Sequence, residues 1–524
     1  MPSPTLDTPR IAWQPGDDLA AIVARHARDN PDGVALVRGD TRRTWAELHQ
    51  RAERVAAGVM NAGLRPGDRL AVLAENSIEY AEVFFGALRA GACVVPLPTM
   101  ASADALARMM VDSGSRALFA SGAYGAVARS VADAAAERVA LRVGFDFDDD
   151  AFQRYAAFAD RPAAPAPPVP IGADDAFDVI YSSGTTGIPK GIVHSHAARK
   201  ASYGGGRAAY FDERSVNVIA TPFYSNTTSV TWFITTARGG TNVLLGKFTP
   251  EALLDAVERH RVTHAMLVPV QYDRILQSPR FAATDLSSLH MLFSTSAPLA
   301  AATKRRILDE TPADLIEIYG LTEGGPVAIL EARRHPDKLA SVGRPAPGHD
   351  VRIIDDAGRD VPAGQAGEVI GRSPNMMSGY LNRPDDTQAM LFRDASGALF
   401  FRTGDLGRFD EDGFLYLLDR KKDVIISGGF NVYATDLEGV LAKHPEVAEV
   451  AVIGVPSERW GETPIALVVR KAGGAATADE LREYCNARVG KAQRLAQVEL
   501  REALPRNAIG KVLKRELRDP YWKK

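Results

Sequence analysis

Hydrophobic residues in the first part of the chain alternate between helical and strand spacing. From Thr44 to Val59 the apolar positions recur every three or four residues, which predicts an amphipathic helix. An unbroken apolar run at Leu70–Ala74 predicts a buried strand, followed by a helix at Ile78–Arg89 and a second strand at Cys93–Leu97. This alternation indicates a mostly parallel sheet with helices on its faces.

The same alternation continues in the middle of the chain. Thr249 followed by Pro250 predicts a helix start, because threonine caps a helix well and proline fits the first helical position. Four short apolar runs are expected to be strands: Val216–Ala220, Ala265–Val268, Met291–Phe293 and Leu315–Ile318.

After Gly348 the pattern changes. Short β-type runs between Gly and Pro turns predict a small antiparallel subdomain, with strands at Val351–Ile354, Gly367–Ile370 and Gly413–Tyr416. Toward the C-terminus, strands at 447–453 and 465–469 and helices that begin at Thr435 and Ala478 predict a compact α+β unit. The expected fold is therefore α/β: a large N-terminal domain of mostly parallel sheets covered by helices, with a small β subdomain, followed by a small mobile α+β domain.

Composition excludes several classes of function. The chain has 524 residues, 46% hydrophobic and 24% charged, with a formal net charge of −3, so no nucleic-acid partner is expected. Two cysteines, Cys93 and Cys485, offer no disulfide framework or metal cluster. No secretory signal and no run of about 18 apolar residues is visible. We therefore expect no membrane span and a cytoplasmic location. If the chain forms an oligomer, a homodimer is expected.

One polar stretch is the strongest indication of chemistry. Tyr181–Gly191 reads YSSGTTGIPKG and follows the short apolar run at Phe177–Ile180. Glycines let several backbone N–H groups face one point, hydroxyls add donors, and Lys190 adds a positive charge, so the stretch predicts a site for phosphate oxygens. The order of Gly184, Gly187 and Lys190 is not that of a Walker loop. A generic run of this composition could also be a polar flexible loop.

The full string resembles the phosphate loop of the acyl-adenylate-forming superfamily, which holds acyl-CoA synthetases, adenylation domains of peptide synthetases and luciferases. The resemblance extends over nearly the whole chain and is greatest to acyl-CoA synthetases. It implies that the loop binds ATP through the following residues: Ser182, Ser183, Gly184, Thr185, Thr186, Gly187 and Lys190. Thr186 is also expected to act in catalysis.

A second motif, Tyr319–Glu323, reads YGLTE and follows a predicted strand. A tyrosine face can stack on a purine, and a glutamate near phosphates can hold Mg²⁺. Taken alone, the two residues fit a strand-end aromatic and a helix-start acid better; the phosphate loop reverses that preference. The resemblance implies adenine stacking by Tyr319, an α-phosphate contact by Thr322, and metal binding and catalysis by Glu323. It places further residues beside the nucleotide: Ser296, Ala297, Pro298, Glu317, Ile318 and Gly320.

Three more motifs lie toward the C-terminus. Phe401–Asp405 contains RTGD, and the resemblance implies that Asp405 binds the ribose, although an Asp after Gly is usually a turn residue. The charged run at 419–423 could be a solvated linker; by resemblance Arg420 contacts ribose or phosphate and Lys422 is the hinge. Gly428 and Gly429 are expected to border the pantetheine arm of CoA.

Lys511 closes the string PRNAIGK at 505–511. A lone lysine is usually only solvated. The resemblance implies that this one spans the reacting carboxylate and the α-phosphate, where positive charge lowers the barrier. The expected domains are an ATP- and acid-binding domain at 1–421 and a mobile domain with the catalytic lysine at 422–524.

The acid pocket departs from the family pattern. Ser225 stands where many relatives have a histidine, and no acidic residue occurs at 221–238 to hold a substrate ammonium, so an amino acid is not the expected substrate. Asn226 resembles an asparagine of hydroxyaryl-acid relatives. The pocket is expected to involve Tyr224, Asn226, Thr227, Gly320 and Gly325, and an aliphatic (fatty) or aryl monocarboxylic acid is the expected substrate.

The expected reaction has two steps. A carboxylate attacks the α-phosphorus of Mg·ATP to give acyl-AMP and pyrophosphate, and the thiol of coenzyme A then takes the acyl group. Transfer to the phosphopantetheine of a separate carrier protein is an alternative. A nucleotide sensor without catalysis is another, although a sensor has no need of Lys511.

Overall fold

The protein is described here by a computed structural model. It covers residue 9 and residues 11–160, 166–182, 189–428, 430–506 and 510–522. The chain forms two compact units. Unit 1 is Met1–Leu339, Pro345–Val351 and Gly371–Phe401, and unit 2 is Ala340–Arg344, Arg352–Ile370 and Arg402–Lys524. The boundary expected between residues 421 and 422 falls inside unit 2, and the domain division at that point stays a prediction.

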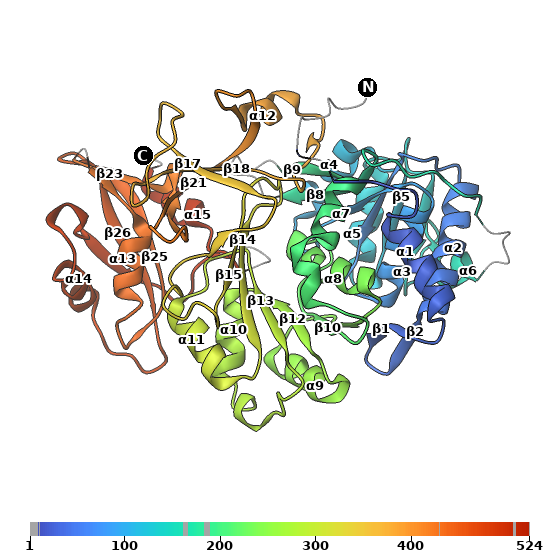
Figure 1. Ribbon diagram of the computed structural model, residues 1–524, viewed down its shortest axis with the longest axis horizontal. Helices are drawn as coiled ribbons and strands as arrows, with labels where there is room; N and C mark the ends of the chain where they lie inside the picture. Colours follow the sequence, from blue (N-terminus) through green and yellow to red (C-terminus); the bar gives the residue numbers. More distant parts are fainter. Residues whose placement is uncertain are drawn as a thin grey trace. The chain divides into compact units, whose positions relative to one another are not determined.

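Two large sheets run through the described part of unit 1 (Figure 1). One has nine strands in the order β16 (Arg344–Pro345), β15 (Val327–Glu331), β14 (Asp314–Gly320), β13 (Met291–Ser294), β12 (His264–Leu267), β10 (Val216–Ile219), β11 (Thr241–Leu244), β1 (Val34–Arg38) and β2 (Thr41–Thr44). The other has eight, in the order β19 (Gly379–Tyr380), β9 (Lys190–Ser195), β8 (Ala176–Ser182), β4 (Cys93–Pro96), β3 (Arg69–Leu73), β5 (Ala117–Ala120), β6 (Leu141–Gly144) and β7 (Gln153–Arg154). Most neighbouring strands are parallel, as the alternating pattern predicts.

The helices of unit 1 bury their apolar faces against these sheets. They are α1 (Leu19–Asp29), α2 (Trp45–Asn61), α3 (Ile78–Arg89), α4 (Ala103–Ser113), α5 (Gly125–Asp133), α6 (Tyr155–Ala159), α7 (His196–Gly204), α8 (Asn226–Arg238), α9 (Pro250–His260), α10 (Pro269–Gln277), α11 (Ala301–Glu310) and α12 (Pro384–Ala389). The largest core joins α1, α2, α3 and α8 to strands of both sheets, with Trp45, Phe84 and Trp232 at most 1% exposed. Thr44 and Thr249 cap α2 and α9, so both predicted helix starts are confirmed.

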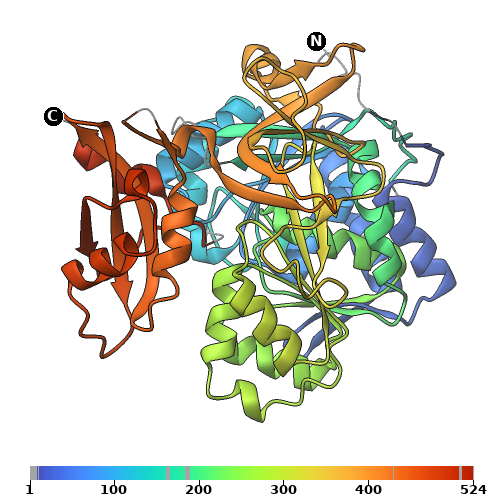
Figure 2. The ribbon, with the colours of Figure 1, turned by 60° about the vertical axis from the view of Figure 1, so that its left-hand side comes forward.

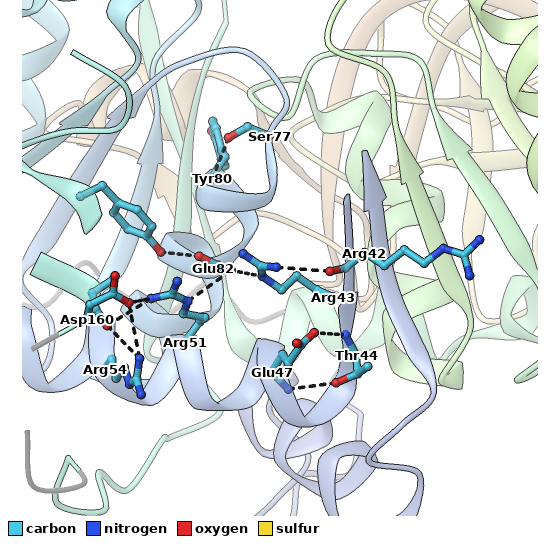
Figure 3. Close-up of polar contacts among 12 residues, drawn as sticks. Arg42, Arg43, Thr44, Glu47, Arg51, Arg54, Ser77, Tyr80, Glu82 and Asp160 are labelled. Carbon is cyan, nitrogen blue, oxygen red and sulfur yellow. Dashed lines mark hydrogen bonds and ion pairs between the residues drawn. The ribbon is translucent and has the colours of Figure 1, made fainter. Parts of the chain in front are cut away.

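A buried carboxylate ties together the helices near the N-terminus of unit 1 (Figure 3). Glu82 on α3 is 1% exposed, and its oxygens accept hydrogen bonds from Tyr155 Oη at 2.7 Å and Arg43 Nε at 3.0 Å. Arg51 lies at 4.0 Å from the same carboxylate and also pairs with Asp160. Burial raises the pKa of Glu82, and Tyr155 and Arg43 oppose that shift. This cluster anchors α6 to α2 and α3.

Short antiparallel strands follow Gly348, as predicted. The sheet has the order β17 (Asp350–Ile354), β18 (Gly367–Arg372), β21 (Leu399–Phe409) and β20 (Leu391–Arg393), and β22 (Leu415–Arg420) pairs with β21. The strand expected at Gly413–Tyr416 begins only at Leu415. The Asp410 carboxylate accepts a hydrogen bond from Phe414 N at 2.8 Å, and Gly413 has φ +78°, so the first two residues belong to a turn.

The rest of unit 2 is the predicted α+β unit. Its sheet has the order β24 (Phe430–Val432), β23 (Ile425–Ser427), β26 (Gly461–Arg470) and β25 (Val447–Ser457), with β27 (Gln497–Leu500) beside β26. Helices α13 (Ala434–Leu441), α14 (Ala478–Asn486) and α15 (Lys514–Trp522) lie alongside these strands, in orange to red in Figure 2. Helix α13 begins one residue before Thr435, because the Asp419 carboxylate accepts from Ala434 N at 2.7 Å. Among the described residues, no helix is both long and apolar enough to cross a membrane.

Candidate active site

The predicted phosphate loop joins two adjacent strands. Ser182 ends β8, Lys190 begins β9, and the two residues are paired across the antiparallel ladder. Between them, the following predicted site residues lie outside the described residues: Ser183, Gly184, Thr185, Thr186 and Gly187. The described ends of the loop therefore lie side by side at one end of the β8–β9 hairpin.

Lys190 and Glu323 come together around a tyrosine that the sequence motifs did not indicate. Tyr380 on β19 donates a hydrogen bond from its hydroxyl to Glu323 Oε1 at 2.8 Å. Lys190 Nζ lies 5.0 Å from the centre of the Tyr380 ring and 3.1 Å from Asp386 Oδ2. A cation over the ring and a carboxylate on its hydroxyl make Tyr380 the link between Lys190, at the end of the predicted phosphate loop, and the YGLTE motif.

The loop after β13 is held from two sides. Ser296 has φ +77°, an uncommon left-handed backbone for a residue other than glycine, and its hydroxyl lies 2.5 Å from Thr227 Oγ1 of α8. Thr295 donates to the carbonyl of Ile318 at 2.8 Å. These bonds connect the loop that carries Ala297 and Pro298 both to the predicted acid helix and to β14, which ends in Tyr319 and Gly320.

Glu317 supports this same loop through its side chain. One carboxylate oxygen accepts a hydrogen bond from Leu299 N at 2.8 Å, and the other pairs with the ammonium of Lys304. Both side chains are 2% exposed, and burial raises the pKa of Glu317 although Lys304 opposes the shift. The carboxylate of Glu317 is thus occupied within the fold, and its predicted place beside the nucleotide rests on its backbone.

Several of the residues predicted to form the acid pocket lie at the N-terminus of α8. Ser225 is the N-cap of α8, and its hydroxyl accepts from Thr227 N at 3.3 Å. Tyr224 is buried, which raises its pKa, and its hydroxyl is hydrogen-bonded to Thr99. Asn226 is the first residue of the helix and is half-buried. Gly325, also predicted here, is buried in the turn after the YGLTE motif.

Unit 2 gathers three predicted site residues from motifs far apart in the sequence. Arg420 Nε lies 3.2 Å from Asp405 Oδ1. Lys511 interacts electrostatically with both residues and with Asp423 and Lys422. Burial, reinforced by repulsion from Arg420, lowers the pKa of Lys511 to about 8, and the carboxylates of Asp405 and Asp423 oppose that shift. The result is a cluster of cationic side chains in which Asp405, the predicted ribose acceptor, is paired with Arg420.

The predicted hinge and the predicted CoA glycines lie in the same unit. Lys422 is the middle residue of a short 3₁₀ turn, Lys421–Asp423, and its carbonyl accepts from Arg518 at 3.3 Å. Gly428 has φ +58° and donates its N–H to the carbonyl of Trp460 at 2.8 Å. Gly429 lies outside the described residues.

The donor set at Glu323 fits a magnesium ion that arrives with a nucleotide. Tyr380 donates to one carboxylate oxygen, and among the described residues the other oxygen accepts no hydrogen bond and can face a ligand. Among the described residues no group of three or more acidic, His or Cys side chains forms a metal cage. Mg²⁺ commonly uses one or two carboxylates together with substrate phosphates and water, so a single carboxylate beside a phosphate loop suffices.

Several polar residues near these motifs escaped the sequence motifs: Asp178, His194, Arg199, Lys304, Tyr380 and Asp386. The sequence did contain a signal for Asp178, because a charged residue inside an apolar strand needs a buried partner. The partner itself, Arg199, could not be identified from spacing, since it lies on a helix beyond the loop.

Comparisons with known proteins place this geometry in a family. A family model described as "AMP-binding enzyme" matches residues 23–381, and one described as "AMP-binding enzyme C-terminal domain" matches residues 436–511. The chain is 37% identical over 513 residues to a feruloyl-CoA synthase of Amycolatopsis sp., covering 95% of this chain and 98% of that protein. It is 32% identical over 516 residues to the fatty acid–[acyl-carrier-protein] ligase ScoC of Streptomyces coeruleorubidus, covering 96% of each.

A solved structure is also similar to this chain. ATP-bound MatB from Rhodopseudomonas palustris has a TM-score of 0.85 and 31% identity, covering 97% of this chain and 99% of that one. The chain therefore belongs to the AMP-binding enzyme family. Within the family it is an AMP-forming enzyme of the acid–thiol ligase class.

Proposed function

We propose that this enzyme is an ATP-dependent carboxylic acid–CoA ligase that forms an acyl-AMP intermediate and releases pyrophosphate and AMP. The observation that carries the proposal is the cluster of Lys511, Arg420 and Asp405, in which a half-buried lysine lies beside a paired arginine and carboxylate. Nucleotide transfer needs such charges, because one anion must attack another.

Each residue has a place in the two steps. Lys190 and Thr322 hold phosphate oxygens, and Tyr319 stacks on adenine. Asp405 accepts from the ribose hydroxyls, and Arg420 orients that carboxylate at 3.2 Å. Lys511 neutralises the charge that grows as the acid oxygen bonds to the α-phosphorus and the bond to pyrophosphate breaks. Mg²⁺ held by Glu323 would neutralise further phosphate charge.

In the second step the thiol sulfur attacks the acyl carbon and AMP leaves. Coenzyme A is the proposed acceptor, and the similarity to a feruloyl-CoA synthase supports it. The similarity to a fatty acid–[acyl-carrier-protein] ligase keeps a carrier protein as the second candidate. Incubation of the enzyme with ATP, an acid and either thiol separates the two, since only the true acceptor yields thioester at a catalytic rate.

The proposed acid is an aryl or fatty monocarboxylic acid. Acid-dependent exchange of labelled pyrophosphate into ATP, measured over a panel of aryl and fatty acids, tests the first step and identifies the acid. No exchange with any acid would contradict the proposal.

The pKa of Lys511 gives a pH dependence. An ammonium is charged below its pKa, so with a pKa of about 8 Lys511 loses its charge as the pH rises through 8. We expect kcat/KM for ATP in acyl-AMP formation to be constant near pH 7 and to fall about tenfold per unit well above pH 8. The measurement is the exchange rate at low ATP from pH 6.5 to 9.5.

Lys511→Arg is the control for this pH profile. A guanidinium stays charged throughout this pH range, so whatever activity the variant retains should not fall above pH 8. A fall that persists unchanged in Lys511→Arg would assign the titration to another group.

Gly428 provides a test of the thiol step. A Cβ at this position would lie 2.8 Å from the Trp460 ring, on a backbone with φ +58° that side chains rarely adopt. Gly428→Ala should therefore displace the loop, leave pyrophosphate exchange unchanged and slow acyl-CoA formation by about tenfold or more. Each half-reaction is measured separately.

Gly439→Ala is the matched control. Gly439 lies in α13 of the same unit, and a Cβ there meets nothing within 4 Å. It should leave both half-reactions unchanged. If Gly428→Ala also left acyl-CoA formation unchanged, the proposed place of Gly428 beside the thiol substrate would be wrong.

A further inference from the structure

Unit 1 contains a cluster of buried charges that the proposed mechanism does not use. Asp178 on β8, His194 on β9 and Arg199 on α7 are 1%, 2% and 4% exposed. Arg199 Nη2 donates to Asp178 Oδ2 at 2.6 Å, and His194 Nδ1 lies 2.8 Å from Asp178 Oδ1. Burial raises the pKa of Asp178, but Arg199 and His194 outweigh it and hold that pKa below its usual range. The carboxylate is therefore ionised and paired.

Two hydrogen bonds connect this cluster to the predicted site. His194 Nε2 donates to the carbonyl of Thr322, in the YGLTE motif, at 2.7 Å. Arg199 Nη1 donates to Asn226 Oδ1, at the start of α8, at 2.7 Å. One buried ion pair thus contacts both the motif proposed to bind the α-phosphate and the helix proposed to bind the acid.

The contact with Arg199 fixes which way the Asn226 amide faces. A guanidinium has donors only, so the Asn226 atom beside it must be the oxygen. The Ser229 hydroxyl lies 3.1 Å from the same oxygen. Turning the amide over would set its NH₂ group against the guanidinium, donor against donor. Among the described residues, Asn226 Nδ2 has no hydrogen-bond partner, and its residue is half-buried.

We propose that Arg199 is a positioning residue for acid recognition. It holds the Asn226 amide with its NH₂ group available to the bound acid, so that the site selects carboxylic acids with a further oxygen acceptor, such as a methoxy, hydroxyl or carbonyl group. The inference rests on the proposed function and names the class of acid within it. Asp178 orients Arg199 through their hydrogen bond, and the rings of Phe177 and Phe233, with centres 6.0 and 5.8 Å from its guanidinium carbon, shield it from water.

The readout is a selectivity ratio between two acids of equal size. The aryl pair is a phenylpropenoic acid with a methoxy group at ring position 3 or 4 and the same acid with an ethyl group at that position. The two acids differ only in one ether oxygen, which can accept a hydrogen bond but cannot donate one. Octanoic acid and an ether analogue of the same length form the aliphatic pair. The ratio of kcat/KM values in pyrophosphate exchange is measured within one enzyme preparation, so a loss of folded protein cancels. In the unaltered enzyme we expect the ether acid to be preferred by about tenfold in at least one pair.

Two substitutions should abolish the preference. Asn226→Ala removes the donor, and Arg199→Lys keeps a positive charge for Asp178 but has no planar fork to reach Asn226 at the same time. The ratio should fall to about one in each variant. The double variant should show no further fall, because both changes act on the same contact.

Arg43→Lys is the matched control, since it makes the same change at another buried carboxylate, Glu82 (Figure 3). It should leave the ratio unchanged. If Arg199→Lys fails to fold, Asn226→Asp takes its place: it keeps an acceptor for Arg199, removes the donor and should also abolish the preference for the ether acid.

The outcomes separate the inference from the function beneath it. An Arg199→Lys variant that slows both acids equally and keeps the ratio would reduce Arg199 to a structural role and overturn the inference. An unaltered enzyme that turns over both acids of every pair equally would overturn it as well. Absence of exchange with any acid would instead contradict the proposed function.

Discussion

Lys511→Ala should abolish acyl-AMP formation and leave thioester formation from acyl-AMP intact. The lysine interacts electrostatically with Arg420 and Asp405 and is half-buried, so water only partly replaces its charge. Removing one well-placed charge from a phosphoryl-type transition state costs about 100-fold or more in rate. The second step forms no new bond to phosphorus, so it has no such need of Lys511. The measurement is each half-reaction alone: pyrophosphate exchange for the first, and acyl-CoA yield from supplied acyl-AMP for the second.

Lys471→Ala is the control for the loss of a positive charge. Lys471 is exposed in a turn of the same unit, and its removal should leave both half-reactions unchanged. If Lys511→Ala slowed the two steps equally, the lysine would not be specific to adenylation, and the assignment of separate roles to Lys511 and Gly428 would be wrong.

The sequence predicted the elements that local rules determine. Thr44 and Thr249 mark helix starts through side chains that cap their own helices, so spacing alone located α2 and α9. The alternation of apolar runs predicted the parallel sheets, because crossover helices must cover both faces. Helix α13 shows where local rules stop predicting helix starts. Asp419 caps this helix from another element, and no local sequence pattern indicates that contact.

The sequence alone identified the candidate motifs but not the residues that hold them in place. The strings around Lys190, Tyr319, Asp405 and Lys511 could be identified because each is contiguous. Tyr380, which links Lys190 to Glu323, is separated from both by long stretches of chain, and only the pairing of β19 with β9 brings it there. Glu317 is the opposite case, a motif residue whose carboxylate turns inward to Lys304 and Leu299.

Buried charge is the physical reason for these gaps. Asp178 sits in an otherwise apolar strand, and burying an unpaired carboxylate is costly, so a cation had to be nearby. The sequence offers many arginines and no means of choosing among them. Tertiary structure selects Arg199, and with it the orientation of Asn226, which no spacing rule contains.

Lys422→Pro should have the opposite effect to Lys511→Ala. Lys422 lies in a 3₁₀ turn directly after Arg420, between β22, which ends in Arg420, and β23, which leads to Gly428. If residue 422 is the hinge on which the chain changes conformation between the two steps, a proline that fixes φ near −65° restricts that change. Acyl-AMP formation should then continue, while acyl-CoA formation slows by about tenfold or more and acyl-AMP accumulates. Rapid quenching with quantification of both products measures this.

Lys422→Ala distinguishes the backbone from the side chain. It removes the ammonium, whose pKa burial lowers, but leaves φ free, so it should allow both steps. Equal slowing of thioester formation in the proline and alanine variants would mean that the side chain matters and not the rotation about residue 422. Equal slowing of both steps in the proline variant, with an unchanged melting temperature, would contradict a hinge at this residue. The prediction therefore depends on a difference between two variants and two steps, which general damage to the fold does not produce.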